Sequence, residues 1–218
     1  MTDDNHQRIL QAAARVYAQH GWRGATTRRI AEEASVNEVT LFRHFGSKDA
    51  LLEQMMRELS AAKAGLSLEG VPKNPENELL GWARAHHQDT STRRTLIRQI
   101  MSDAEERPDL INCATNGPNN AATQLRSYVA QLRAHGFVPG EEVLAPAEAA
   151  AAVTMLMGAV FADGMNRDIM PAMFSRPVDE TLRAYVRIFL RGLGAHAEPV
   201  AFTGRTAEGV QTLTSISE

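Results

Sequence analysis

The chain has 218 residues, of which 44% are hydrophobic and 22% charged, with a formal net charge of -3. This length supports a sizeable core, and the charge gives no global basic field for nucleic acid, although a local patch would be enough. A single cysteine, Cys113, excludes an intramolecular disulfide and an all-cysteine zinc site. The N-terminus has no apolar signal segment, and the most apolar run, residues 149–164, is too short to span a bilayer. We therefore expect a soluble, cytoplasmic protein with no membrane partner.

Apolar residues recur with helical spacing at the start of the chain. We expect three short helices within residues 6–44, the first of which ends at His20-Gly21. Thr26 and Thr27 offer N-cap side chains for the second helix, and Ser47 is placed to cap a longer fourth helix.

The rest of the chain shows the same period, and no segment alternates with period two. Residues 66–78 are rich in Pro, Gly and Asn and indicate a linker. We predict an all-α fold of about nine helices. The expected domains are a helix-turn-helix domain over residues 1–47, a helical ligand-binding and dimerisation domain over 48–194, and a polar tail over 195–218. Further helical segments are expected around residues 79–86, 96–101, 118–134, 146–164 and 177–193.

The last two helical segments are apolar on more than one side, which indicates burial on more than one side. The second side could face a partner subunit, so a homodimer is expected. The dimer interface is predicted to contain Val153, Met157, Val160, Leu182, Tyr185, Val186 and Phe189.

Two short helices joined by a tight turn at residues 34–37 form a helix-turn-helix, whose second helix lies in the major groove of DNA. Helix N-termini, hydroxyl groups and basic side chains bind phosphates. The side chains expected to contact DNA are Thr26, Thr27, Arg28, Arg29, Asn37, Glu38, Thr40, Leu41, Phe42, His44 and Lys48.

The charges of the first 60 residues balance, with eight Lys and Arg against eight Asp and Glu. A basic surface must therefore come from placing Arg23, Arg28, Arg29, Arg43 and Lys48 on one side. Val36, Val39 and Phe45 are expected to anchor the second helix to its scaffold.

Residues 26–52, TTRRIAEEASVNEVTLFRHFGSKDALL, resemble the DNA-binding motif of the tetracycline-repressor (TetR) family, including the Ser47-Lys48 pair that begins the fourth helix. The resemblance departs from the family at Phe42, where a tyrosine is usual, and at Glu38, where a small or basic residue is more common. Glu38 can accept a hydrogen bond from cytosine N4, or it can stabilise the positive helix N-terminus without contacting DNA.

This resemblance implies a transcriptional repressor that binds a palindromic, double-stranded operator as a dimer and is released by a small apolar effector. The alternative is an architectural or cell-cycle DNA-binding protein of the same fold without an effector. The sequence has no nucleophile–base pair and no metal-spaced cluster, so we expect no enzymatic activity, no cofactor and no metal. Side chains that could converge on a ligand are Trp82, His86, Met101, Tyr128, Met157 and Phe161.

Overall fold

The computed structural model describes residues 2–61, 68, 70–109, 112, 116–140 and 144–196, and these residues form helices and connections without a strand. The predicted all-α fold is confirmed, with eight helices in this part of the chain against the nine or so predicted. The predicted C-terminal tail lies outside the described residues from position 197 onward. The helices are α1 (Thr2–Gly24), α2 (Thr27–Glu33), α3 (Glu38–Phe45), α4 (Lys48–Ala61), α5 (Pro75–Ser102), α7 (Asn116–Ala134), α8 (Pro146–Asn166) and α9 (Val178–Gly192).

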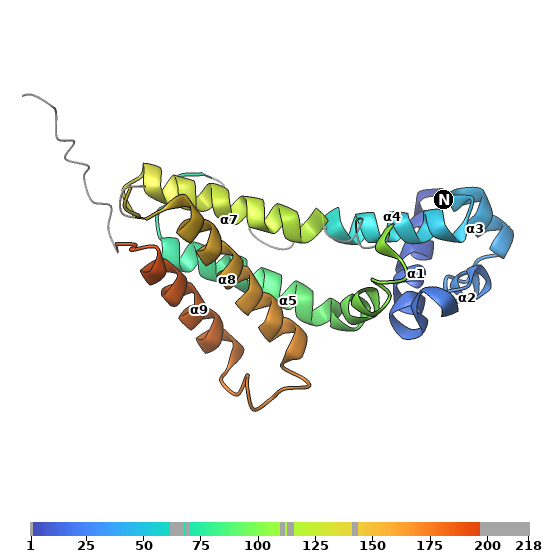
Figure 1. Ribbon diagram of the computed structural model, residues 1–218. Helices are drawn as coiled ribbons and strands as arrows, with labels where there is room; N and C mark the ends of the chain where they lie inside the picture. The colour runs from blue at the N-terminus through green and yellow to red at the C-terminus, as the bar shows by residue number, and fades with distance from the viewer. Residues whose placement is uncertain are drawn as a thin grey trace, which may run out of the picture.

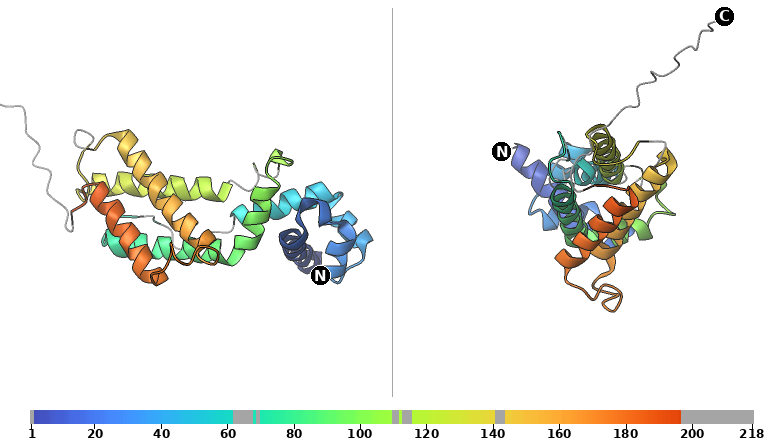
Figure 2. Two further views of the ribbon diagram at one scale, coloured as in Figure 1. Left: turned by 60° about the horizontal axis from the view of Figure 1, so that its bottom comes forward. Right: turned by 90° about the vertical axis from the view of Figure 1, so that its left-hand side faces the viewer.

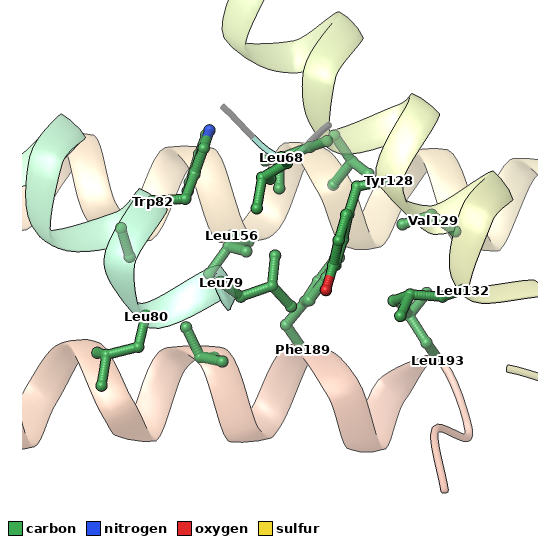
Figure 3. Packing of buried hydrophobic residues seen from close by; sticks show 14 of the residues in the cluster. Leu68, Leu79, Leu80, Trp82, Tyr128, Val129, Leu132, Leu156, Phe189 and Leu193 are labelled. Carbon is green, nitrogen blue, oxygen red and sulfur yellow. The ribbon is translucent and has the colours of Figure 1, made fainter. Parts of the chain in front are cut away.

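The molecule is elongated, with α1 to α4 at one end and α7, α8 and α9 at the other (Figure 1). The long helix α5 runs between the two ends, and Figure 2 gives the same arrangement from two further sides. One hydrophobic cluster contains residues from the four helices α1, α2, α3 and α4 and from the C-terminal end of α5. A second cluster lies among the N-terminal part of α5, α7, α8 and α9 (Figure 3). The helix α5 therefore contributes to both cores.

The predicted stop at Gly21 is confirmed as a break inside α1. Gly21 has a φ of 63°, a conformation that favours glycine, and the residues on either side of it are helical. A Cβ atom at this position would lie 2.5 Å from the side-chain amide of Gln99 on α5. Glycine is favoured here by the backbone conformation, whereas the Gln99 amide is the end of a flexible side chain and could move aside.

The turn between α2 and α3 is closed by backbone hydrogen bonds. The N–H of Ser35 donates to the carbonyl of Glu32, and the N–H of Val36 donates to the carbonyl of Ala31, each at 3.0 Å. Ser35 itself has a φ of 53°, in the left-handed region that L side chains disfavour. The helix-turn-helix therefore forms with strain at a non-glycine residue.

We expect Ser35→Gly to raise the free energy of unfolding by up to about 1 kcal/mol. Relief of the left-handed strain is worth roughly 1–2 kcal/mol, and the greater unfolded-state entropy of glycine offsets part of it. Urea denaturation measures the change. Ser35→Ala, which keeps the strained φ, is the control and should bring no gain; equal stability of the two variants would contradict the strain.

Residues 79–101 belong to a single helix, which corrects the prediction of two separate segments. Helix α5 has 28 residues, is capped by Asn74, whose side-chain oxygen accepts from the N–H of Asn77 at 3.1 Å, and begins with Pro75. Proline suits this first position because its missing N–H would have no helical partner. The polar sequence between the two apolar segments does not interrupt the helix, and its first residue, His87, is buried and binds Asp163 of α8.

The predicted dimer-interface residues lie in the core of the subunit itself. Val153, Val160, Leu182, Val186 and Phe189 are all buried among α5, α7, α8 and α9. Met157 and Tyr185 are partly buried and pack against the same cluster. The five buried side chains pack in the interior of their own subunit and therefore offer no surface to a partner. A contact of the partly exposed Met157 and Tyr185 with a partner stays a prediction.

Helix α8 is long and apolar enough to cross a membrane by length and composition alone, and 33% of its most apolar window is buried. One face of α8 packs in the core through Val153, Leu156 and Val160. Met155 and Phe161 of the same helix are exposed, on a surface where a core helix would carry polar side chains.

Candidate nucleic-acid interface

Helix α3 is fixed by its cap and by two buried side chains. The side-chain oxygen of Asn37 accepts from the N–H of Val39 at 2.8 Å and caps the helix. Leu41 is completely buried and Phe45 is nearly so. The predicted anchoring by Val36 and Phe45 is confirmed, because both pack in the N-terminal cluster. The predicted contact of Leu41 with DNA is wrong, since this side chain faces the core.

The exposed face of α3 carries Val39, Phe42 and Arg43. Val39 is 72% exposed, so the prediction that it anchors the helix is wrong, and Phe42 is 46% exposed. Arg43 is exposed as well, and no hydrogen bond or ion pair to it occurs within the described part of the chain. Two apolar side chains and an unpaired cation thus occupy the surface of the helix that is free to meet another molecule.

Glu38 binds a residue of its own chain. The Thr27 hydroxyl donates to its carboxylate at 2.5 Å and ties the N-terminus of α2 to that of α3. Glu38 also lies in the first turn of α3, where its charge favours the helix dipole. This hydrogen bond adds a third role to the two weighed from the sequence, and it occupies the hydroxyl of Thr27.

The N-terminal end of α2 is arranged as predicted. Thr26 is the N-cap, and its hydroxyl oxygen accepts from the N–H of Arg29 at 3.3 Å. The guanidinium of Arg29 donates to the carbonyl of Gly24 at 3.0 Å, whereas Arg28 pairs with Glu32 at 2.9 Å on the open surface. Such exposed pairs contribute little to stability, so the Arg28 guanidinium can exchange partners at small cost.

Lys48 lies at the start of α4 and contacts Trp22 twice. Its Nζ donates to the carbonyl of Trp22 at 2.5 Å and lies 4.3 Å from the centroid of the indole ring. Burial lowers the pKa of Lys48, with a smaller opposing effect from Asp49. Within the subunit the ammonium is bound to the end of α1. Its two other N–H groups could still donate to a phosphate, so the predicted phosphate contact stays a prediction.

His44 and Thr40 are both half-buried rather than open. The Nε2 atom of His44 is buried without a hydrogen-bond partner. The ring lies 5.9 Å from His6 and 6.1 Å from Phe45 by centroid distance, and those two rings stack on each other at 4.7 Å. Contact with a base edge through Nε2 would require this ring to turn outward. The predicted cap of the next helix is confirmed, because the hydroxyl of Ser47 accepts from the N–H of Ala50 at 3.1 Å.

A carboxylate at the end of α5 holds the DNA-binding end of the chain. Asp103 accepts from the hydroxyl of Tyr17 at 2.8 Å and from the N–H of Trp22 at 2.9 Å, both on α1. The side chain of Gln99 donates to the same carboxylate at 3.2 Å. Burial and the bond to Asp103 raise the pKa of Tyr17, which keeps its hydroxyl a donor. Sequence reasoning missed this contact, because residues 81 or more apart make it.

Arg107 adds a second contact at the same place. Its guanidinium lies 4.4 Å from the centroid of the Trp22 ring and pairs with Asp49 of α4 at 3.1 Å. We use the name latch for Tyr17, Trp22, Asp49, Asp103 and Arg107. The latch joins α1 and α4 to the segment that follows α5.

The predicted ligand residues divide into two groups. Trp82 and Tyr128 are buried, Met157 packs against their cluster, and His86 is half-buried. Figure 3 shows Trp82 and Tyr128 on either side of Leu68. Met101 and Phe161 are exposed and do not join this interior, so a contact of either with a ligand stays a prediction. The hydroxyl of Tyr128 is already bound to Glu78, and burial together with that bond raises its pKa.

A buried ionic cluster lies beside this core. Asp163 is wholly buried, and both of its oxygens accept from the guanidinium of Arg167 at 2.8 Å. His87 Nε2 lies 2.8 Å from the same carboxylate, and the hydroxyl of Tyr185 lies 3.4 Å from it. Burial raises the pKa of Asp163, but the hydrogen bonds from Arg167 and His87 outweigh it and lower the pKa overall. The cluster joins α5, α8 and α9.

Known proteins match this chain in sequence and in fold. The sequence profile of the bacterial regulatory proteins of the tetR family matches residues 9–55. YvkB of Bacillus subtilis, an uncharacterized HTH-type transcriptional regulator, is 26% identical over 192 residues, which cover 87% of this chain and 97% of YvkB. The transcriptional repressor AcnR of Corynebacterium efficiens is 32% identical over 112 residues, which cover 48% of this chain and 55% of AcnR. A crystal structure of a TetR-family regulator from Mesorhizobium loti shares the fold, with a TM-score of 0.65 at 19% identity over 88% of this chain and 97% of that one.

Proposed function

Because the chain belongs to the tetR family of bacterial regulatory proteins, we propose that it is a cytoplasmic transcriptional repressor that binds a palindromic operator as a homodimer and is released by a small apolar molecule. The observation that carries the proposal is the open face of α3, held between α2 and α4 with Val39, Phe42 and Arg43 outward. The second helix of such a motif enters the major groove.

The chemistry of this face suits major-groove reading. Valine and phenylalanine can contact the methyl group of thymine, which is the apolar feature of that groove. Arginine can bind guanine through two hydrogen bonds or bind a phosphate. The cap at Thr26 and the exposed Arg28 place phosphate-binding groups at the end of the neighbouring helix. Glu38, held by Thr27, then fixes α3 against α2 in this proposal rather than reading cytosine.

The dimer surface is proposed on the exposed side of α8 and α9. On α8, a stripe of apolar or small residues at spacings of three or four is exposed, and it lies opposite the buried stripe. On α9, Ala184 and Ile188 are exposed on the side opposite Leu182 and Val186. We use the name outer face for the exposed residues Ala147, Ala151, Met155, Gly158, Phe161, Ala184 and Ile188. A large apolar surface of this kind marks an interaction site, and a second copy of the chain would cover it.

The unbroken helix α5 could transmit the effect of a bound ligand from the C-terminal core to the DNA-binding helices. Trp82 and His86 lie on this helix in the C-terminal core, and its last residues meet α1 at the latch. From Trp82 to Asp103 the helix covers about 30 Å. A ligand that shifts α5 by binding beside Trp82 would move the DNA-binding end as well. It must bind the DNA-incompetent conformer more tightly than the competent one.

Selection of bound fragments from a random DNA library tests the proposal. A palindromic sequence with two half-sites should be enriched, with half-sites separated by about one helical turn or more. Enrichment of sequences without two-fold symmetry would contradict the dimeric repressor and favour an architectural DNA-binding protein.

Replacing Arg43 with alanine should weaken binding to the selected operator and lower the slope of log K against log salt concentration by about 1, the expected loss for one phosphate contact. Fluorescence anisotropy at several salt concentrations measures both. Arg126→Ala, which removes an exposed arginine from α7, is the matched control and should change neither quantity. If the Arg43→Ala variant loses its preference at one base pair of the operator while the salt slope stays constant, Arg43 contacts a base and not a phosphate.

A further inference from the structure

Two polar ring atoms in the C-terminal core lack a hydrogen-bond partner. They are Nε1 of Trp82 and Nε2 of His86, both buried from solvent. Only 1% of Trp82 is exposed, and the two ring centroids lie 4.2 Å apart, one turn apart on α5. A buried donor without a partner is unfavourable, so a molecule that supplies an acceptor here would be bound more tightly.

The other polar groups of this core have partners. Tyr128 binds Glu78, and His87 binds Asp163. Among the described residues, the side-chain atoms buried without a partner belong to Trp82, His86 and His44, and His44 lies in the DNA-binding end. The two rings that carry the unpaired atoms of the C-terminal core are therefore adjacent, so a single partner group could serve both.

The two rings restrict the chemistry of what could fill this position. An indole N–H only donates, so its partner must offer an acceptor. Burial lowers the pKa of His86, so the imidazole is neutral at neutral pH and can donate or accept, depending on its tautomer. Neither ring supplies a positive charge, and a buried carboxylate without a cation is costly. An uncharged acceptor such as a carbonyl oxygen fits both rings.

We propose that Trp82 and His86 form the polar subsite of the effector pocket and bind the carbonyl oxygen of an uncharged, otherwise apolar molecule. The proposal rests on the ligand-responsive function proposed above and names the chemical class of the ligand. Trp82 lies beside Leu68, Leu79 and Leu156, which offer apolar contacts for the rest of the molecule (Figure 3).

Two probes of nearly equal shape test the subsite. Acetophenone and α-methylstyrene differ in one group, a carbonyl oxygen in the first and a methylene in the second. Binding to the full-length chain without DNA is followed by the indole ¹H–¹⁵N resonance of Trp82, which is the only indole left in a Trp22→Phe background because the chain has two tryptophans. Acetophenone should bind about tenfold more tightly than α-methylstyrene, as expected for one added hydrogen bond, and should shift the indole proton.

Replacing Trp82 with phenylalanine keeps an aromatic ring and removes the donor. This variant should lose the tenfold preference in calorimetric titration while keeping its affinity for α-methylstyrene. Trp22→Phe is the matched control and should keep the preference, because Trp22 lies in the latch. Equal affinity for the two probes, or no binding of either to the wild-type chain, would overturn the subsite.

The readout separates this proposal from the function on which it rests. A chain that prefers acetophenone but binds no operator contradicts the repressor and leaves the subsite in place. A chain that binds a palindromic operator but does not distinguish the probes contradicts the subsite alone.

Discussion

Replacing Met155 with glutamate is expected to give folded monomers that bind the operator on the order of 10²–10⁴-fold more weakly, because the second half-site no longer adds avidity. Met155 is 70% exposed at the middle of the outer face, so the new charge disturbs no contact within the subunit. In a dimer it would be buried without a partner, which is strongly unfavourable. Light scattering gives the mass, and anisotropy gives the operator affinity.

Two further variants make this result specific. Ile188→Glu, on the neighbouring helix and 62% exposed, should have the same effect. Ala130→Glu introduces the same charge at an exposed position of α7 and should leave both mass and affinity unchanged. A Met155→Glu protein that remains a dimer at micromolar concentration would place the interface elsewhere. A charge at Phe189, by contrast, should unfold the subunit, because this side chain is part of its core.

Replacing Asp163 with asparagine should destabilise the subunit by about 3–5 kcal/mol, the usual cost of removing one partner of a buried ion pair. Asparagine nearly preserves the shape but removes the charge, so Arg167 is left without its carboxylate. The loop after α8 should loosen as well, since Arg167 also donates to the carbonyl of Phe174 at 2.8 Å. Urea denaturation followed by circular dichroism measures the loss.

Asp168→Asn is the matched control, five residues further along the chain. Asp168 is an exposed carboxylate that pairs with Arg98 at 2.7 Å, and exposed pairs contribute little to stability, so the loss should be small. A loss of that small size at Asp163 would mean that the buried cluster adds little to stability.

The same cluster predicts an acid-sensitive stability. The pKa of Asp163 is lower in the folded chain than the value of about 3.9 for an unfolded aspartate. Its stabilisation is therefore complete above about pH 4 and is lost as the pH falls through the folded value. The asparagine variant should lose less stability than the wild-type chain between about pH 4 and pH 2.

The sequence by itself determined the class of fold and the place of the DNA-binding motif. Helical period, the caps at Thr26 and Ser47 and the stop at Gly21 are local features, because residues within a few positions of each other produce them. The helix-turn-helix could be located for the same reason, since its turn and caps occupy one short segment. The interior of the C-terminal half was identified in part, with Trp82 and Tyr128 buried as large apolar side chains usually are.

Only the tertiary structure decided which side of each helix faces the core. On α3 the spacing allowed either Val39 or Leu41 to be inside, and packing against α1, α2 and α4 buries Leu41. On α8 the two sides are almost equally apolar, so the sequence offered no contrast between Val153, which is buried, and Met155, which is exposed. The helical period shows which side chains share one side of a helix, but the neighbouring helices determine which side is buried. The contacts of Lys48 with Trp22 and of Asp103 with Tyr17 join residues far apart in the sequence, so only the folded chain brings them together.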